Sequence, residues 1–262
     1  MKLSKALAIF EHICECVPAL AAALTKSPRL LLNPTALKRA VFFKVWSAFG
    51  KFIDQNGAEV KRGLVTLYAE GVALDLGAGL GHTAAYLDRS KVTKYIALEP
   101  NTLMHDGIKK EVAQYGFTEE AGTLQLLSCG AEETDRIVAE IGGQVDTMIA
   151  IRMLCSVPKP QKTIEELMDK VLKPGGQFLF CEHVAHKRWD VRVWQYFWTP
   201  IWGIFFDGCV LYRPTDVYIK NLTCWKPLPE VIPEGDRVGT WDEEEEEENL
   251  LPHQIGRFIK KD

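Results

Sequence analysis

A short apolar segment that ends in a glycine-rich turn is the feature that most constrains the fold of this chain. Val72–Leu76 has the composition of a buried strand, and Asp75-Leu-Gly-Ala-Gly-Leu-Gly81 closes it. Glycines at that point let the backbone approach a ligand closely, and a helix after the turn would present free N–H groups. We therefore expect an α/β fold with a ligand site at the carboxyl end of this strand.

Four more apolar runs follow the first strand and alternate with amphipathic stretches. They cover residues 95–98, 123–127, 145–151 and 177–181. Strands that alternate with helices of about 10–15 residues are typical of right-handed crossovers and a parallel sheet covered on both faces. The expected fold class is therefore α/β, with a mostly parallel sheet.

Residues 1–70 predict a helical N-terminal extension, ahead of a single compact domain at 71–262, because they carry no strand signal. In the first helix, apolar residues recur at spacings of three and four, and we expect them to form the packed face: Leu3, Leu7, Phe10, Cys14 and Val17. Glu11 and His12 interrupt the apolar run, which argues against a spanning helix or a secretory signal. A helix that lies on a membrane surface is the alternative.

The charge balance gives no indication of a nucleic-acid partner. Lys and Arg number 31 against 35 Asp and Glu, so the net charge is −4. Seven acids are concentrated at residues 242–248, and without them the net charge would be +3. We expect that run to be a solvated loop, on a body whose charge does not point to a charged substrate.

The seven cysteines indicate reduced thiols in the cytoplasm rather than disulfides or metal ligands. Cys14-x-Cys16 has no second pair at the spacing of a zinc site, so no metal is expected. Cys155 and Cys209 are expected to be small buried residues rather than nucleophiles.

The residues around the first turn distinguish between nucleotide-like ligands. A dinucleotide fingerprint needs its third glycine at position 82, where this chain has His82, and the Gly-Lys-Ser/Thr of a P-loop is absent. Asp75 stands two residues before Gly77 and disfavours a pyrophosphate, but it can hold the ammonium group of an amino-acid-bearing cofactor. Glu99, at the end of the second strand, can accept hydrogen bonds from both hydroxyls of a ribose.

With these residues the chain resembles the class I S-adenosylmethionine-dependent methyltransferases. The resemblance is carried by residues 74–81, by Ala97-Leu-Glu-Pro100 and by Lys173-Pro-Gly-Gly176. It implies a Rossmann-like sheet of seven strands, with a final antiparallel strand near residues 254–260, and S-adenosyl-L-methionine as the cofactor. The cofactor-binding residues that it implies here are Asp75, Gly77, Ala78, Gly79, Gly81, Glu99 and Pro100.

Two further positions of the cofactor site follow from the same resemblance. In the family, the loop after the third strand holds the adenine, often through an acid and the next N–H group. This chain has Gly130 where that acid is expected, which leaves Ala131 and Glu132 for the task. Arg152, after the fourth strand, either reaches the carboxylate of the cofactor or is a solvated charge at the strand end.

A closer resemblance points to the methyl acceptor. Several short motifs are similar to those of the methyltransferase-like group of animal alkyl-thiol methyltransferases: Leu154-Cys-Ser-Val157, Phe180-Cys-Glu-His-Val184, Tyr196-Phe-Trp198, Pro200-x-Trp202 and Phe206-Asp-Gly-Cys209. They imply methylation of a small, largely apolar molecule, with sulfur as the favoured acceptor atom. An O- or N-methyltransferase of natural-product type is one alternative, and a cofactor-binding protein that guides a cyclisation or only binds is another.

Two residues are candidates for assisting a thiol acceptor, whose pKa near 8.5 asks little of a base. His183 is the first candidate, as base or for acceptor orientation, unless it is a structural histidine bonded to Glu182 or to a carbonyl. Asp207 is the second, unless it caps the turn at Gly208. The aromatic stretch at residues 187–206 is expected to form part of the core and part of an apolar acceptor pocket.

Overall fold

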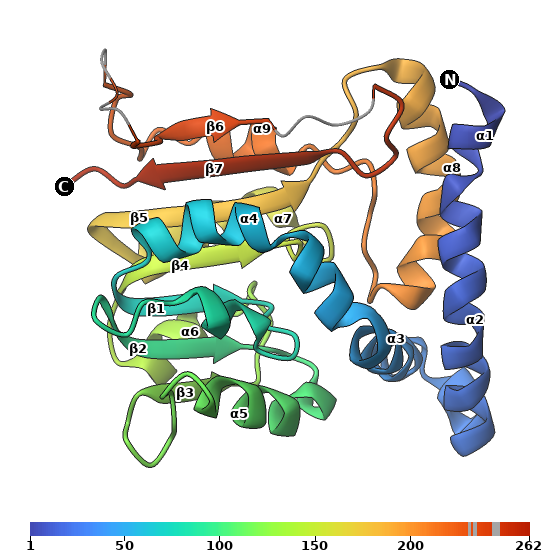
Figure 1. The fold of residues 1–262 in the computed structure, drawn as a ribbon, viewed down its shortest axis with the longest axis horizontal. Coiled ribbons are helices and arrows are strands. Elements are labelled where there is room, and N and C mark those ends of the chain that lie inside the picture. The colour runs from blue at the N-terminus through green and yellow to red at the C-terminus, as the bar shows by residue number, and fades with distance from the viewer. Residues whose placement is uncertain (230–231, 233–234, 243–246) are drawn as a thin grey trace.

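A seven-stranded sheet forms the centre of the computed structural model, which describes residues 1–229, 232, 235–242 and 247–262 (Figure 1). Its strands follow the order β3-β2-β1-β4-β5-β7-β6. They are β1 (Gly71–Leu76), β2 (Val92–Leu98), β3 (Leu124–Leu127), β4 (Val145–Ile151), β5 (Leu172–His183), β6 (Gly239–Trp241) and β7 (His253–Ile259). Neighbours from β3 to β5 are parallel, whereas β7 is antiparallel to both β5 and β6.

The predicted fold class is confirmed. Strands β1 to β5 overlap the apolar runs of the sequence, because a parallel sheet covered on both faces needs continuous apolar strands. Strands β2 and β5 begin earlier than predicted, at Val92 and Leu172, and β5 includes residues 173–176, for which a turn was expected. The final antiparallel strand expected near residues 254–260 is β7. Strand β6 was not predicted, since three residues are too few for a pattern.

Helices cover both faces of the sheet and its carboxyl-end edge. They are α1 (Leu3–Ala6), α2 (Ala8–Lys26), α3 (Pro34–Asn56), α4 (Ala58–Lys61), α5 (His105–Ala113), α6 (Thr134–Ile141), α7 (Pro160–Glu166), α8 (Trp189–Phe205) and α9 (Thr215–Lys220). Helix α3 begins at Asn33, whose side chain accepts a hydrogen bond from the Ala36 N–H, with Pro34 in the first turn.

The N-terminal extension and the aromatic helix form one layer beyond the strand ends. Helices α2 and α8 lie side by side, and α3 runs between them and the carboxyl ends of the parallel strands (Figure 1). Their shared core joins Ile13 of α2, Val45 of α3 and Trp198 of α8. Helix α3 therefore belongs to the structure around the strand ends, although the boundary at residue 70 stays a prediction.

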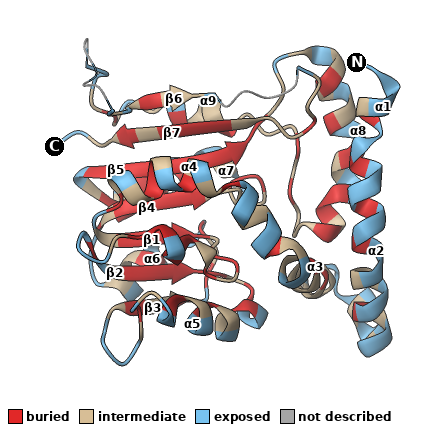
Figure 2. Cartoon of the chain, viewed as in Figure 1, coloured by how far each residue is buried: buried red, intermediate tan, exposed pale blue. Residues whose placement is uncertain are grey.

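The predicted packed face of the first helix is wrong. The side chains of Leu3, Leu7, Phe10 and Val17 are 43–64% exposed, and Cys14 is exposed as well. The buried face is the neighbouring one, with Ala6, Ile9, Ile13, Cys16 and Ala23 (Figure 2). Because the helix is apolar around most of its circumference, spacings of three and four fit both faces equally well.

By length and composition, the segment Leu3–Lys26 could cross a membrane, and 22% of its most apolar window is buried inside the molecule. The charged residues in this segment argued against a spanning helix, but they are few enough for the segment to pass a test based on length and composition. Core helices of soluble proteins and N-terminal signal sequences satisfy it too.

The described ends of the acidic run differ in their surroundings. Glu247 is 91% exposed, as expected of a solvated loop. Glu248 is mostly buried, since it accepts a hydrogen bond from the Lys2 N–H and pairs with Arg188. Residues 243–246, which carry the rest of that prediction, lie outside the described residues.

Candidate active site

A cavity of about 1060 Å³ opens at the carboxyl ends of β1, β2, β4 and β5. It lies at the upper end of the size range of small-molecule pockets, so it has room for two ligands side by side. Helix α3 and the end of α8 cover it and supply its aromatic wall: Phe42, Trp46, Phe49, Phe52, Trp202 and Phe206.

The glycine-rich turn forms one end of this cavity, where Gly77, Ala78 and Gly79 line it. Gly77 and Gly79 both have a left-handed backbone, with φ of 65° and 59°. A Cβ atom on Gly77 would lie 2.8 Å from the Met153 side chain, and one on Gly79 would lie 2.8 Å from Trp46 Nε1. Glycine is therefore required by backbone conformation and by lack of space. Gly81 has a φ of 84° and begins the next turn without lining the cavity.

The segment after the turn is a single 3-10 turn at His82–Tyr86 rather than the expected regular helix. Its first residue, His82, lines the cavity. The Nε2 atom of His82 is buried and has no hydrogen-bond partner in the described part of the chain. Such an orphaned polar atom indicates a place for a polar ligand group.

Asp75 is buried at the end of β1 and lines the same end of the cavity. Its Oδ2 accepts a hydrogen bond of 2.6 Å from the Tyr95 hydroxyl. Burial raises the pKa of this carboxyl to about 6, although the bonds from Tyr95 and Thr83 oppose the rise. An ion pair of 2.6 Å between Lys61 and Asp54, which sequence reasoning missed, also lines the cavity.

Glu99 follows β2 and is held by two backbone groups. Its Oε2 accepts from the Gly79 N–H at 2.9 Å, and its Oε1 accepts from the Asn101 N–H at 2.8 Å. Burial raises its pKa to about 7. A carboxylate accepts about four hydrogen bonds, so both oxygens keep capacity for ligand hydroxyls. Pro100 lines the cavity next to it.

The loop after β3 places Ala131 and Glu132 at the cavity, and their contact with the adenine stays a prediction. A side chain at Gly130 would collide with the Glu132 carboxylate. The carboxylate of Glu132 thus lies where an acidic side chain at position 130 would begin. Its position explains how the loop can keep an acid near the cavity with glycine at position 130.

Arg152 lies at the cavity and is held by the protein. Its Nε donates to His253 Nε2 at 3.1 Å, and its backbone N–H donates to the Cys181 carbonyl at 2.9 Å. Arg152 is therefore tied to β7 by a hydrogen bond, and its pairing with the cofactor carboxylate stays a prediction. His253 comes from β7, and sequence reasoning missed it because 101 residues separate it from Arg152.

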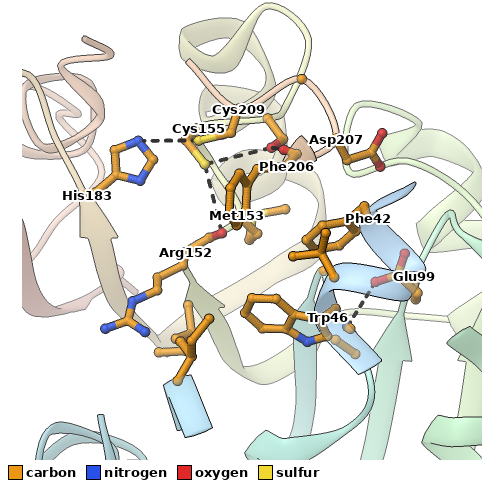
Figure 3. Close-up of a pocket in the computed structure, with 18 of the residues that line it drawn as sticks. Phe42, Trp46, Glu99, Arg152, Met153, Cys155, His183, Phe206, Asp207 and Cys209 are labelled. Atoms are coloured by element: carbon orange, nitrogen blue, oxygen red, sulfur yellow. Dashed lines mark hydrogen bonds between the residues drawn. The ribbon is translucent and has the colours of Figure 1, made fainter. Parts of the chain in front are cut away.

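His183, the last residue of β5, is 5% exposed and points toward two cysteines at the cavity wall (Figure 3). Its Nε2 lies 3.5 Å from Cys209 Sγ, and Cys155 lies beside them. Burial opposes protonation of His183, but Cys155 and Glu182 outweigh it and raise its pKa above the ordinary value. Glu182 points elsewhere, because its carboxylate accepts from the Met153 and Leu154 N–H groups.

Asp207 follows α8 with a φ of 45° and lines the cavity. Burial raises its pKa, although Arg39 and Lys38 oppose the rise. Its charge also contributes to the raised pKa of Glu99, and both acids line the cavity. The Gly208 N–H donates to a backbone carbonyl, that of Gly203, which leaves the Asp207 carboxylate free of that capping role.

The aromatic stretch divides as expected between core and pocket. Trp202 and Phe206 line the cavity and stack at 3.9 Å, whereas Trp198 and Phe205 are core residues. Phe197 is 58% exposed. Sequence reasoning missed the aromatic residues of α3, because an amphipathic helix far from the glycine turn gives no sign that it covers the site.

The methyltransferase domain family matches residues 49–216, which is more than half of the chain. The chain therefore belongs to that family, and its cofactor is S-adenosylmethionine. The residues described above fit this group: a glycine turn that excludes side chains, two buried carboxylates and an orphaned His82 Nε2.

Two human proteins illustrate its relatives. The chain is 32% identical to thiol S-methyltransferase TMT1A over 145 residues, or 53% of this chain and 54% of that protein. It is 30% identical to thiol S-methyltransferase TMT1B over 163 residues, or 61% and 62%. The match thus spans less than two thirds of these relatives.

Solved structures show the same fold. An O-methyltransferase family protein from Burkholderia thailandensis superposes with a TM-score of 0.61 at 12% identity, over 95% of this chain and 71% of that one. The N-methyltransferase NodS from Bradyrhizobium japonicum WM9, in complex with S-adenosylhomocysteine, gives 0.52 at 9% identity, over 79% and 87%.

Proposed function

We propose that this protein transfers the methyl group of S-adenosylmethionine to the sulfur of a small, largely apolar thiol. The observation that carries the proposal is one continuous cavity, which joins the glycine turn and Glu99 to an aromatic wall and to Asp207. The names of the human relatives support sulfur as the acceptor atom.

The cofactor half of the cavity uses groups of the chain that are already in place. Glu99 would accept hydrogen bonds from the ribose hydroxyls, and Asp75 would face the ammonium group, directly or through water. Ala131 and Glu132 would hold the adenine, and Arg152 would pair with the carboxylate. When bound, S-adenosylmethionine supplies a methyl group on a positively charged sulfonium.

The acceptor half of the cavity aligns the reacting thiol and excludes water from it. The stacked Trp202 and Phe206 pack against an apolar acceptor and keep water out. Asp207, whose raised pKa brings it nearer to that of a thiol, accepts the thiol proton. Alignment of the acceptor sulfur with the methyl carbon supplies most of the remaining rate enhancement.

A scan of acceptors tests the proposal. The full chain is incubated with methyl-labelled cofactor and matched alkyl thiols, phenols, carboxylic acids and amines, and labelled products are counted. Turnover of thiols at least about tenfold above the others is expected. Strong turnover of phenols or amines alone would overturn the sulfur assignment. Cofactor binding by calorimetry without transfer to any acceptor would indicate a binding protein.

The place of action is part of the same proposal. We place the protein in the cytoplasm, where it acts on small molecules and needs no nucleic-acid partner. Its net charge of −4 does not favour binding to nucleic acid. The exposed apolar side chains of α2 would let it rest on a membrane surface, where apolar thiols concentrate.

A further inference from the structure

Three metal-ligating side chains from distant parts of the sequence meet at the wall of the cavity. They are Cys155 in the loop after β4, His183 at the end of β5 and Cys209 in the loop after α8. Their ligand atoms all lie within 4.8 Å of one another, and each side chain is buried. All three line the cavity, and Figure 3 shows them pointing toward one another.

The spacing is that of a tetrahedral metal centre. With zinc–sulfur and zinc–nitrogen bonds of about 2.3 and 2.0 Å, tetrahedral geometry separates sulfur and nitrogen ligands by about 3.5 Å. The Cys209 Sγ and His183 Nε2 atoms are 3.5 Å apart. The Cys155 sulfur lies within 4.8 Å of both of these atoms, and metal binding would draw it closer.

The surrounding backbone holds the three residues in place. The Val210 N–H donates to the Cys155 carbonyl at 3.1 Å, which joins the two cysteine loops. Arg213 donates to the Leu154 carbonyl, beside Cys155, at 3.0 Å. Pairing with β7 fixes the backbone of His183. Such preformed scaffolding is what a metal site needs in order to bind without large rearrangement.

We propose that Cys155, His183 and Cys209 bind one Zn²⁺ ion, with a fourth coordination position open to the cavity. Two thiolates, a neutral imidazole and a divalent ion form a neutral group, which a buried site accepts at low electrostatic cost. Two Cys and one His with an open position is a ligand set of catalytic zinc. No pattern in the sequence indicated this site, because its ligands are far apart in the chain and come together only through the fold.

The open position suits the acceptor, and this use of the site rests on the proposed thiol methylation. A thiol R–SH that bound there would lose its proton to solvent, since a metal-bound thiol ionises readily. The resulting thiolate forms a sulfur–carbon bond as the sulfonium–methyl bond breaks. The products are the thioether R–S–CH₃, S-adenosylhomocysteine and one proton, so charge and atoms balance.

Metal content of the purified full chain tests the site without any acceptor present. The protein is reduced, stripped with a chelator, equilibrated with Zn²⁺ and desalted, and zinc per chain is measured. About one equivalent is expected for the wild type. Cys155→Ser, Cys209→Ser and His183→Gln should lower the affinity about a hundredfold or more, whereas Cys129→Ser, which removes a buried thiol outside the cavity, should not.

A Co²⁺ spectrum reports the coordination of the metal, and cofactor binding reports whether each variant is folded. Cobalt in the wild type should give the intense visible bands of tetrahedral thiolate coordination, and each ligand variant should lose or change them. Calorimetry with S-adenosylhomocysteine shows which variants are folded. Zinc binding that is absent in the wild type, or equal in folded ligand variants, overturns the proposal, as does a Cys155–Cys209 disulfide in place of metal.

The two proposals fail separately. A wild type that binds no zinc but methylates thiols overturns the zinc site and leaves the proposed function standing, and thiol methylation at full rate in stripped protein overturns the role of the metal in activating the acceptor. Stoichiometric zinc in a protein that methylates only phenols or amines overturns the thiol assignment and leaves the metal site standing.

Discussion

Glu99→Gln isolates the contribution of one carboxylate to cofactor binding. The replacement keeps the shape of the side chain but puts an NH₂ group opposite either the Gly79 or the Asn101 N–H, each of which donates to the carboxylate at 2.9 and 2.8 Å. The backbone N–H left unpaired is unpaired with and without cofactor, so it lowers stability rather than affinity. In the complex the amide also accepts from only one ribose hydroxyl, and a buried donor left without a partner costs about 1–3 kcal/mol. We expect cofactor affinity to fall by about five- to 150-fold or more.

The same residue predicts a pH dependence whose sign follows from its chemistry. The ribose hydroxyls donate to the ionised carboxylate, so binding favours the charged form and is lost as pH falls through about 7. Glu99 is about 90% ionised at pH 8 and about 10% at pH 6. Between those values, the affinity of the wild type relative to the Glu99→Gln variant should therefore fall about tenfold.

Calorimetry with S-adenosylhomocysteine at pH 6, 7 and 8 measures both effects. Taking the ratio of wild type to variant cancels the titration of the ligand and of every other shared group. Glu119→Gln, a change at an exposed surface acid, serves as the control and should bind like the wild type. A ratio that stays constant across this range, or a Glu99→Gln affinity within about twofold of the wild type, would refute the assigned role.

Three shorter predictions concern the turn, the base and the exposed helix face. Gly79→Ala forces a left-handed alanine against Trp46, so the free energy of unfolding measured by calorimetry should fall by about 1–2 kcal/mol, together with cofactor affinity. Gly143→Ala, whose Cβ atom meets open space, should change neither quantity. Asp207→Asn should leave cofactor affinity near that of the wild type but lower the rate of thiol methylation about 10²- to 10⁴-fold. It should also remove the acidic limb of the pH–rate profile, because only the ionised carboxylate accepts a proton. An unchanged rate would contradict the base assignment. Phe10→Ser should reduce flotation of the chain with lipid vesicles, and a wild type that never floats would contradict a membrane-facing α2.

The sheet and the cofactor end of the site were predictable because their signals are local. A buried parallel strand is a continuous apolar run, and the turn after β1 needs glycine at Gly77 and Gly79 for reasons of backbone conformation. Glu99 follows its strand directly, so its place at the sheet edge follows from the fold class. In each case a few residues that are neighbours in the sequence determine both the local backbone and the chemical groups that it presents.

The face of α2 and the cover of the cavity were not predictable in the same way. Helix α2 is apolar on two sides, so the choice between Phe10 and Ile9 as the packed residue depends on what α3 and α8 present to it. Trp46 reaches Gly79 only because α3 crosses the strand ends, which no periodicity in α3 reveals. Tertiary packing decides both features.

The arrangement of the cavity explains why acceptor chemistry and cofactor binding are tied together in this chain. Asp207 and Glu99 line one cavity, and the charge of Asp207 contributes to the raised pKa of Glu99. The sulfonium of S-adenosylmethionine would bring a positive charge into this cavity. A positive charge favours the ionised form of the carboxylates and thiols near it. Asp207 should therefore be more fully ionised, and an acceptor thiol more acidic, once the cofactor is in place, which favours binding of the cofactor before activation of the acceptor.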